Sequence, residues 1–85
     1  MITEEYIPIE QQIGALFEFR RLSLGLSTRD VAKAIGVTNR TYVKFEDGFI
    51  PMNITNFFDL CKLFDVTPAE ILAEIKFPPK GGKMK

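Results

Sequence analysis

Residues 25–48 read GLSTRDVAKAIGVTNRTYVKFEDG, two short runs with helical spacing of apolar residues separated by a glycine. Ser27 is a good N-cap for the first run, and Asp30, three residues later, completes a variant of the capping box. The first helix is expected over about residues 27–36 and the second over about residues 38–47. The stretch therefore predicts two helices joined by a tight turn.

This layout is that of a helix-turn-helix, in which the first helix braces against the DNA backbone and the second enters the major groove. Tyr42 and Phe45, with Val37 in the turn, are expected to face inward. The opposite face of the second helix carries, after Asn39 at its exposed start, the residues Arg40, Val43, Lys44 and Asp47. Asn39, Arg40 and Lys44 are side chains suited to reading base edges, so they are the predicted base-reading residues.

Three further helices are expected around this pair. In chain order, the first of the five helices precedes the pair and covers about residues 10–22. The fourth is capped by Asn53, and the fifth starts at Thr67, which is followed by a proline and a capping-box glutamate. Most apolar residues, Cys61 among them, are assigned to the core that these short helices must share. The predicted fold class is all-α, a compact five-helix domain with the helix-turn-helix at about residues 27–46.

Length and composition exclude several kinds of function. A chain of 85 residues is expected to be one domain, here residues 13–76, with an N-terminal extension over residues 1–12 and a flexible basic tail over residues 77–85. Because it has no His and a single Cys, we expect no zinc site, no His-activated nucleophile, no cofactor and no enzymatic activity. We see no secretory signal or membrane span, which predicts a cytoplasmic protein.

The net charge of zero argues against a protein whose affinity for nucleic acid comes from bulk charge. The charges are nevertheless unevenly spread: residues 20–46 hold six basic and two acidic residues, whereas residues 1–19 hold four acidic residues and no basic one. Positive charge therefore coincides with the predicted helix-turn-helix. The lysines of the tail are interpreted as solvated, with a basic arm along DNA as the alternative.

The stretch 25–38, followed by Tyr42, by residues 45–48 and by residues 53–71, resembles the phage lambda repressor/Cro (XRE-like) helix-turn-helix family. The resemblance covers about residues 13–72. It implies a sequence-specific, dimeric, DNA-binding transcription regulator, a repressor or an autoregulator. The expected partners are double-stranded DNA with a two-fold operator and a second copy of the chain.

The resemblance also implies roles for individual residues. Arg21 and Glu46 fall where relatives form a partly buried ion pair between two helices. Asn39 is placed to bond an adenine, and Arg40 and Lys44 are each placed to reach a guanine or a phosphate, two roles that the sequence leaves open. Phosphate contacts are expected from Thr28, Arg29, Thr38 and Thr41.

Two departures from the family pattern matter for function. Relatives commonly have Gln where this chain has Thr28, so a longer side chain that contacts phosphate is missing. The loop after the helix expected at residues 38–47 is often polar in relatives, but here Phe49, Ile50 and Met52 are apolar and expected to be exposed. We interpret these three as a homodimer interface; the alternative is that Phe49 or Ile50 folds back on the fourth helix.

A second class of function stays open. The chain can be a protein-interaction module that keeps this fold, has lost DNA binding and acts through the apolar loop at residues 49–52. Within the DNA-binding class, the fold also occurs in antitoxins and in restriction-modification controllers, and Arg40-Thr41-Tyr42 looks similar to a stretch in the controllers.

Overall fold

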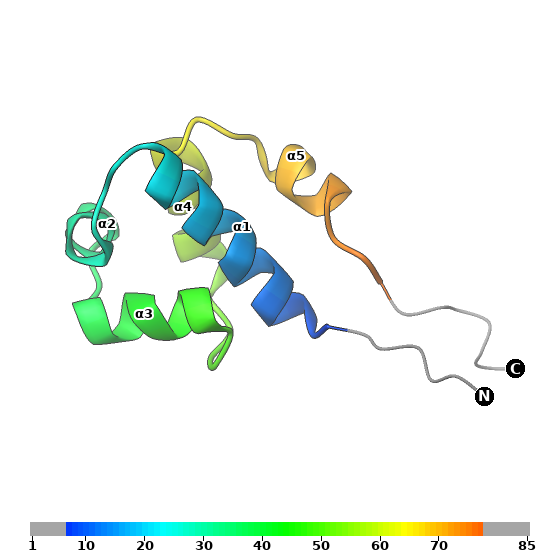
Figure 1. Ribbon diagram of the computed structural model, residues 1–85, viewed down its shortest axis with the longest axis horizontal. Coiled ribbons are helices and arrows are strands. Elements are labelled where there is room, and N and C mark those ends of the chain that lie inside the picture. The colour runs from blue at the N-terminus through cyan, green and yellow to red at the C-terminus, as the bar shows by residue number, and fades with distance from the viewer. Residues whose placement is uncertain (1–6, 78–85) are drawn as a thin grey trace, which may run out of the picture.

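The computed structural model describes residues 7–77 and folds them into five helices, with no strand among these residues. The helices are α1 (Ile9–Ser23), α2 (Thr28–Ile35), α3 (Asn39–Asp47), α4 (Ile54–Leu63) and α5 (Pro68–Ala73) (Figure 1). The all-α, five-helix prediction is therefore confirmed. Most of the predicted extension and tail, residues 1–6 and 78–85, lies outside the described residues.

The helices α2 to α5 start where their capping residues predicted. Ser27 accepts from the backbone N–H of Asp30 at 3.0 Å, and Oδ2 of Asp30 accepts from the backbone N–H of Ser27 at 2.9 Å. Thr67 makes the same reciprocal pair at the start of α5. Such caps satisfy backbone donors that the first helical turn leaves unpaired, which is why short sequence signals place helix starts well.

Aromatic side chains form the centre of the core. Phe17 of α1 is fully buried, with its ring centroid 5.8 Å from that of Phe57 and 5.8 Å from that of Phe64. Cys61 is buried beside them, as expected, and this burial raises the pKa of its thiol. The thiol is therefore kept protonated and acts as a small apolar side chain.

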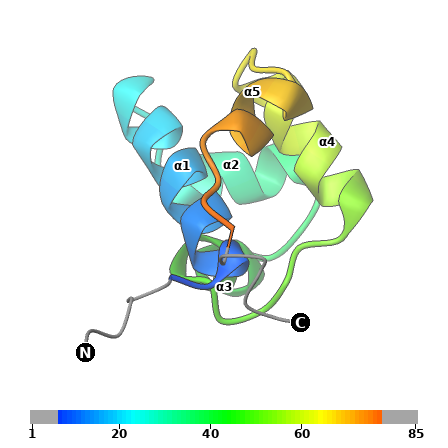
Figure 2. The ribbon, with the colours of Figure 1, turned by 90° about the vertical axis from the view of Figure 1, so that its right-hand side faces the viewer.

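Helices α1 and α3 cross closely at a glycine. A Cβ atom added to Gly14 would overlap the backbone carbonyl groups of Phe45 and Glu46, so no other residue fits there without a shift of the backbone. In Figures 1 and 2 alike, α3 lies at the lower edge of the molecule and α5 at the upper edge, with α1 between them. Helix α3 is thus held closely against the backbone of α1.

Gln12 joins the two ends of the described chain. Its Nε2 donates to the carbonyl oxygens of Ile7 and Lys76 at 2.8 Å each, and its Oε1 accepts from the backbone N–H of Lys76 at 2.7 Å. These bonds fix the segment after α5 against the start of α1. None of the helices within residues 7–77 is both long enough and apolar enough to span a bilayer.

Candidate nucleic-acid interface

The turn between α2 and α3 is built from a left-handed glycine and a threonine cap. Gly36 has a φ of 79°, a conformation that favours glycine, and it ends α2. The next residue, Val37, donates its backbone N–H to the carbonyl of Ala32 at 3.0 Å, and Thr38 caps α3 by accepting from the N–H of Thr41 at 3.1 Å. The two helices are thereby held as one unit.

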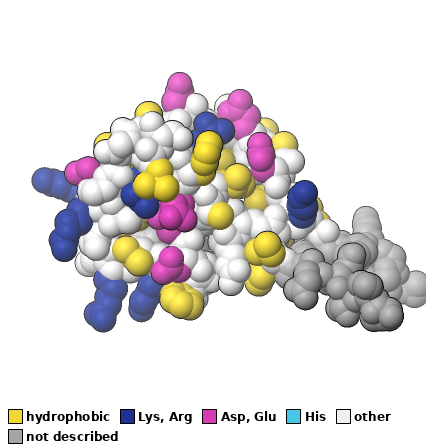
Figure 3. Space-filling view, viewed as in Figure 1, with side chains coloured by type: hydrophobic (Ala, Val, Ile, Leu, Met, Phe, Trp, Pro, Cys, Tyr) yellow, Lys and Arg dark blue, Asp and Glu magenta, His cyan; other side chains and the backbone are white. Residues whose placement is uncertain are grey.

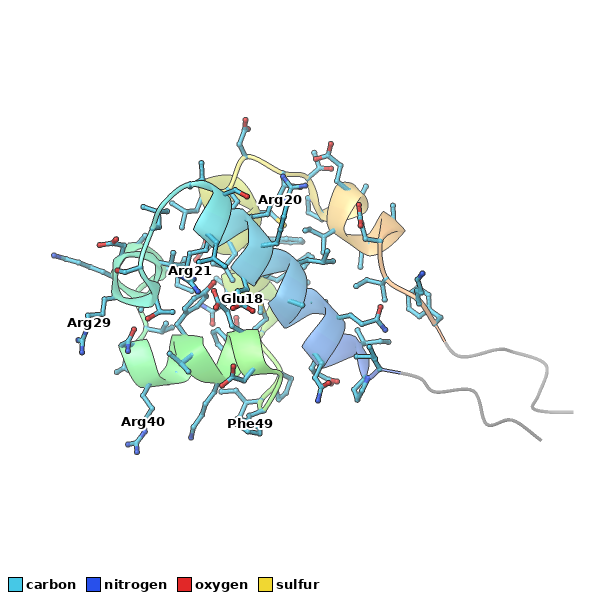
Figure 4. All side chains as sticks on the ribbon, viewed as in Figure 1. Glu18, Arg20, Arg21, Arg29, Arg40 and Phe49 are labelled. Carbon is cyan, nitrogen blue, oxygen red and sulfur yellow. The ribbon has the colours of Figure 1, made fainter. Side chains whose placement is uncertain are left out.

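The outward face of α3 carries the basic side chains. Tyr42 is fully buried and Phe45 is 4% exposed, as predicted, whereas Arg40 and Lys44 are both exposed. Figure 4 shows Arg40 projecting from the lower side of α3, away from the rest of the molecule. The outward side of α3 therefore presents two basic side chains, together with the exposed Asp47 and the half-buried Val43.

Asn39 is placed differently from the sequence-based expectation. The Oγ1 atom of Thr28 donates a hydrogen bond of 2.7 Å to Oδ1 of Asn39, which ties the first turn of α2 to the first turn of α3. Because of this contact, Asn39 is half-buried, whereas we had predicted that it is exposed. The amide keeps its two Nδ2 hydrogens as donors toward solvent or a ligand.

The predicted phosphate-contacting residues gather near the adjoining starts of α2 and α3. Arg29 is exposed in the first turn of α2 and points away from the body of the molecule (Figure 4). The Thr38 hydroxyl donates to the hydroxyl of Thr41, with 3.1 Å between the oxygens. Several of these side chains thus pair with each other, and the exposed N-terminal turns of both helices offer backbone N–H groups beside them.

The charges are segregated in space as well as in sequence. In the view of Figure 3, Lys and Arg side chains gather at the left and lower left, over α2 and α3, and acidic side chains lie along the upper edge and across the middle. The zero net charge is thus an average over unlike surfaces. A basic edge formed over α2 and α3 is the kind of surface that attracts a polyanion.

Arg21 and Glu46 form a two-point ion pair behind this face. Nε of Arg21 lies 2.7 Å from Oε2 of Glu46, and its Nη2 donates to Oε1 at 3.0 Å. A third donor of Arg21 bonds the carbonyl of Leu26 at 2.9 Å, in the loop before α2. The hydrogen bond to Glu46 raises the pKa of Arg21, so the guanidinium stays charged. Through it, α1 is joined to α3 and to the loop before α2.

Tyr42 packs beside this pair. Burial raises the pKa of its phenol strongly, and the neighbouring Glu46 carboxylate adds to the shift. The phenol therefore stays neutral at physiological pH, and its ring meets that of Phe45 edge-on, with centroids 6.4 Å apart.

The loop after α3 divides its apolar side chains between the surface and the core. Phe49 is 75% exposed, as predicted for this loop. Ile50 and Met52 are half-buried and pack against the core, so the prediction that they are exposed is wrong. They turn inward because α1 and α4 leave apolar surface open beside the loop, which includes Ile13 and Phe57.

Sequence reasoning missed three exposed apolar side chains near this loop. Ile54 is 63% exposed, and Phe58 and Leu72 are each 50% exposed, although apolar residues of these helices were assigned to the core. The adjacent pair Phe57-Phe58 was an available signal, because neighbours on a helix point about 100° apart and cannot both enter one core.

Metal chemistry finds no support in the described part of the chain. Within residues 7–77, no three His, Cys, Asp or Glu side chains gather in a way that could hold an ion.

The geometry defines a class of protein: a helix-turn-helix domain with a basic outward helix. Comparison with protein families gives the same result, because the helix-turn-helix family matches residues 17–71, more than half of the chain. The chain belongs to this family, in its XRE-like group, and is a DNA-binding transcription regulator, not an enzyme.

Several solved structures share the fold. The clp gene regulator ClgR from Corynebacterium glutamicum is similar with a TM-score of 0.77 and 19% identity, over 81% of this chain and 73% of ClgR. The restriction-modification controller protein C.AhdI from Aeromonas hydrophila is similar with a TM-score of 0.67 and 23% identity, over 72% of this chain and 92% of the controller. The P22 c2 repressor, solved with a synthetic operator, has a TM-score of 0.65 and 24% identity, over 69% of this chain and 89% of the repressor. A search of curated protein sequences found no match.

Proposed function

We propose that this chain is a sequence-specific, dimeric DNA-binding regulator, a repressor or autoregulator of the cytoplasm, that reads the major groove with α3. The observation that carries the proposal is the outward face of α3, where exposed Arg40 and Lys44 follow an Asn39 that Thr28 already holds in place. A side chain fixed before binding loses less conformational entropy when it meets a base, which favours base readout at that position.

The roles of the individual residues follow from their positions. Asn39 donates to a base edge through Nδ2, and adenine is the base that its amide pairs with best. Arg40 and Lys44 reach a guanine or a phosphate. The backbone N–H groups of the first turns of α2 and α3, with the side chains of Thr28, Arg29, Thr38 and Thr41, contact phosphates.

The two-fold operator follows from dimerisation. Two copies of α3 fit successive major grooves on one side of DNA when the half-sites lie about 34 to 36 Å apart. In this proposal the loop of Phe49, Ile50 and Met52 lies at the dimer contact, with Phe49 as its exposed member.

A mobility shift on DNA from upstream of the protein's own gene, repeated at several salt concentrations, tests the proposal. Affinity should fall steeply with salt, with a logarithmic slope of about 0.9 per phosphate neutralised. The matched control replaces Asn39, Arg40 and Lys44 together with Ala, because all three side chains lie on the surface of α3 that the DNA would meet. If the unchanged chain does not shift DNA even at low salt, the proposal is wrong.

One observation favours a second function. Phe49 is more exposed than any other large apolar side chain in residues 7–77, as a protein-interaction module acting through its loop would require. The triple Ala variant separates the two functions. An interaction module should still bind its protein partner when these three side chains of α3 are removed, whereas a DNA-binding regulator should no longer bind its operator.

A further inference from the structure

Val43 is the apolar side chain on the outward face of α3. This helix has three apolar residues, and the other two, Tyr42 and Phe45, are buried in the core. Val43 is half-buried. Among the described residues, however, neither the core nor the half-buried apolar side chains that pack against it include Val43. Packing of the hydrophobic core therefore gives no reason for an apolar residue at this position.

The stability of the helix gives no reason for it either. A β-branched side chain loses rotamer freedom in a helix, and valine is a weaker helix former than alanine, leucine or lysine. At an outward position that the core does not use, any of these residues would stabilise α3 more. Val43 is thus an apolar group that the fold does not need, which points to a contact with a ligand.

The position of Val43 is between two of the predicted base-reading residues. At about 100° per residue, Val43 lies about 40° around the helix from Asn39 and about 60° from Arg40, which are themselves about 100° apart. Along the helix axis it lies about 6 Å beyond Asn39. Figure 4 shows Arg40 projecting away from the molecule on this side. A DNA groove that meets both Asn39 and Arg40 therefore meets Val43 as well.

The chemistry around Val43 favours a base over a phosphate. Valine has no donor for a phosphate oxygen, and the exposed carboxylate of Asp47, one turn further and about 40° around the helix, repels an anion. The base edges in the major groove show donors and acceptors, and one apolar group among them, the C5-methyl group of thymine. A cytosine methylated at C5 shows the same group in the same place.

We propose that Val43 reads a C5-methyl pyrimidine, with the two methyl groups of the valine packed against the C5-methyl group of the base. The proposal rests on the proposed function, since it needs α3 in the major groove. The base lies at most about two base pairs from the one that Asn39 reads, because 6 Å along α3 spans about two steps of 3.4 Å. Burying one group of this size is worth about 4-fold in affinity.

Duplexes that differ by single methyl groups test the proposal. In the DNA that the chain shifts, each thymine in turn is replaced by uracil, which removes the methyl group and keeps the pairing, and each cytosine in turn is replaced by 5-methylcytosine. We expect one position in each half-site at which the methyl group raises the affinity of the unchanged chain about 4-fold. Val43→Ala should bind the duplexes with and without this methyl group equally well. Val43→Thr, which keeps the branched shape but replaces one methyl group by a hydroxyl, should lose most of the preference.

Val37 provides the matched control. It is also a half-buried valine, but it lies in the turn before α3 and packs against the core. Val37→Ala should therefore lower the Tm and keep the response to the methyl group, whereas Val43→Ala should not lower the Tm and should lose the response. Thermal melts followed by circular dichroism establish the temperature at which all variants are folded, and binding is measured below it.

The two sets of duplexes identify the source of the methyl group. Weaker binding when uracil replaces a thymine identifies thymine, and tighter binding when a cytosine is methylated identifies 5-methylcytosine. If no substitution of either kind changes the affinity, or if Val43→Ala responds as the unchanged chain does, the Val43 proposal is overturned while the proposed function stands, because the DNA is still shifted. If the unchanged chain shifts no DNA, it is the proposed function that fails, and the Val43 proposal fails with it.

Discussion

The Thr28 hydroxyl and the Asn39 amide are joined by a hydrogen bond of 2.7 Å, across eleven residues of sequence and between the first turns of two helices. A hydroxyl has one proton, and Thr28 gives it to Oδ1 of Asn39. The same proton is then not available to a phosphate oxygen. Thr28 therefore orients the Asn39 side chain, which we propose reads a base, and a direct phosphate contact through this hydroxyl would compete with that bond.

Thr28→Val removes the hydroxyl and keeps the branched shape of the side chain. We expect discrimination at the base pair facing Asn39 to fall by about 10-fold, because a fixed polar contact to a base is worth about 1 to 3 kcal/mol. Thr28→Ser, which keeps the hydroxyl, should retain the discrimination. Equilibrium binding to operators that differ by single base pairs measures both. An equal loss on every sequence would instead make Thr28 a phosphate ligand.

The ion pair between Arg21 and Glu46 should matter for stability more than for reading DNA. The side chains are 11% and 6% exposed, so Arg21→Ala leaves a nearly buried carboxylate without its partner. We expect the free energy of unfolding to fall by about 3 to 5 kcal/mol, measured by urea denaturation. The double variant Arg21→Met with Glu46→Leu should recover most of this loss, since it leaves no charge unpaired. If the double variant is as unstable as the single one, the pair itself is stabilising.

Gly14 is a sharp test of how α1 is packed on α3. In an open helix, replacing Gly by Ala stabilises by up to about 1 kcal/mol. At Gly14 the added methyl would meet the backbone carbonyls of Phe45 and Glu46, so we expect Gly14→Ala to destabilise by about 1 to 3 kcal/mol. The exposed neighbour Ala15 gives the matched control, because Ala15→Gly should cost only the helix-propensity difference. Thermal melts of both variants show whether Gly14→Ala raises or lowers the Tm.

The features predicted well from sequence are those that local chemistry controls. Ser27 with Asp30, and Thr67 with its glutamate, form caps within four residues, so the information that starts α2 and α5 lies in those residues alone. The buried positions of α3 follow in the same way from helical spacing, since Tyr42 and Phe45 fall on one face.

The features missed depend on residues far apart in the chain. Ile50 turns inward because α1 and α4 leave apolar surface beside it, and no local pattern contains that fact. The same is true of Asn39, whose partner Thr28 lies on another helix, and of Gly14, which reads as an ordinary helix position until α3 is placed against it. Tertiary contact decides each case.

The capping box of α2 should make stability depend on acid pH. The backbone N–H of Ser27, and then its hydroxyl, lower the pKa of Asp30 below its ordinary value of 3.8. A carboxylate with a lowered pKa stabilises the folded state above the ordinary value, and this stabilisation is lost as the pH falls through the lowered pKa. Asp30→Asn should therefore have a lower Tm than the unchanged chain at pH 7, and the difference should shrink toward about pH 2. Ser27→Ala, which removes an uncharged partner, should lower Tm at both pH values.

Arg40 and Lys44 carry the same charge on the same face of α3, but they should have different roles. A guanidinium bonds a guanine through two parallel donors, whereas an ammonium is a point charge suited to phosphate. Arg40 lies in the first turn of α3 and Lys44 in its last turn, so only Arg40 is near the N-terminal end, which enters the groove in the proposed mode of binding. Arg40→Lys should then lose about 10-fold in affinity for the operator and little for unrelated DNA, with an unchanged salt slope.

Lys44→Gln should lower affinity both for the operator and for unrelated DNA, and it should reduce the salt slope by about 0.9. Binding of each variant to the operator and to unrelated DNA, measured from low to moderate salt, gives the affinities and the salt slopes. If Lys44→Gln loses affinity only for the operator and Arg40→Lys loses it for both DNAs, the two roles are exchanged.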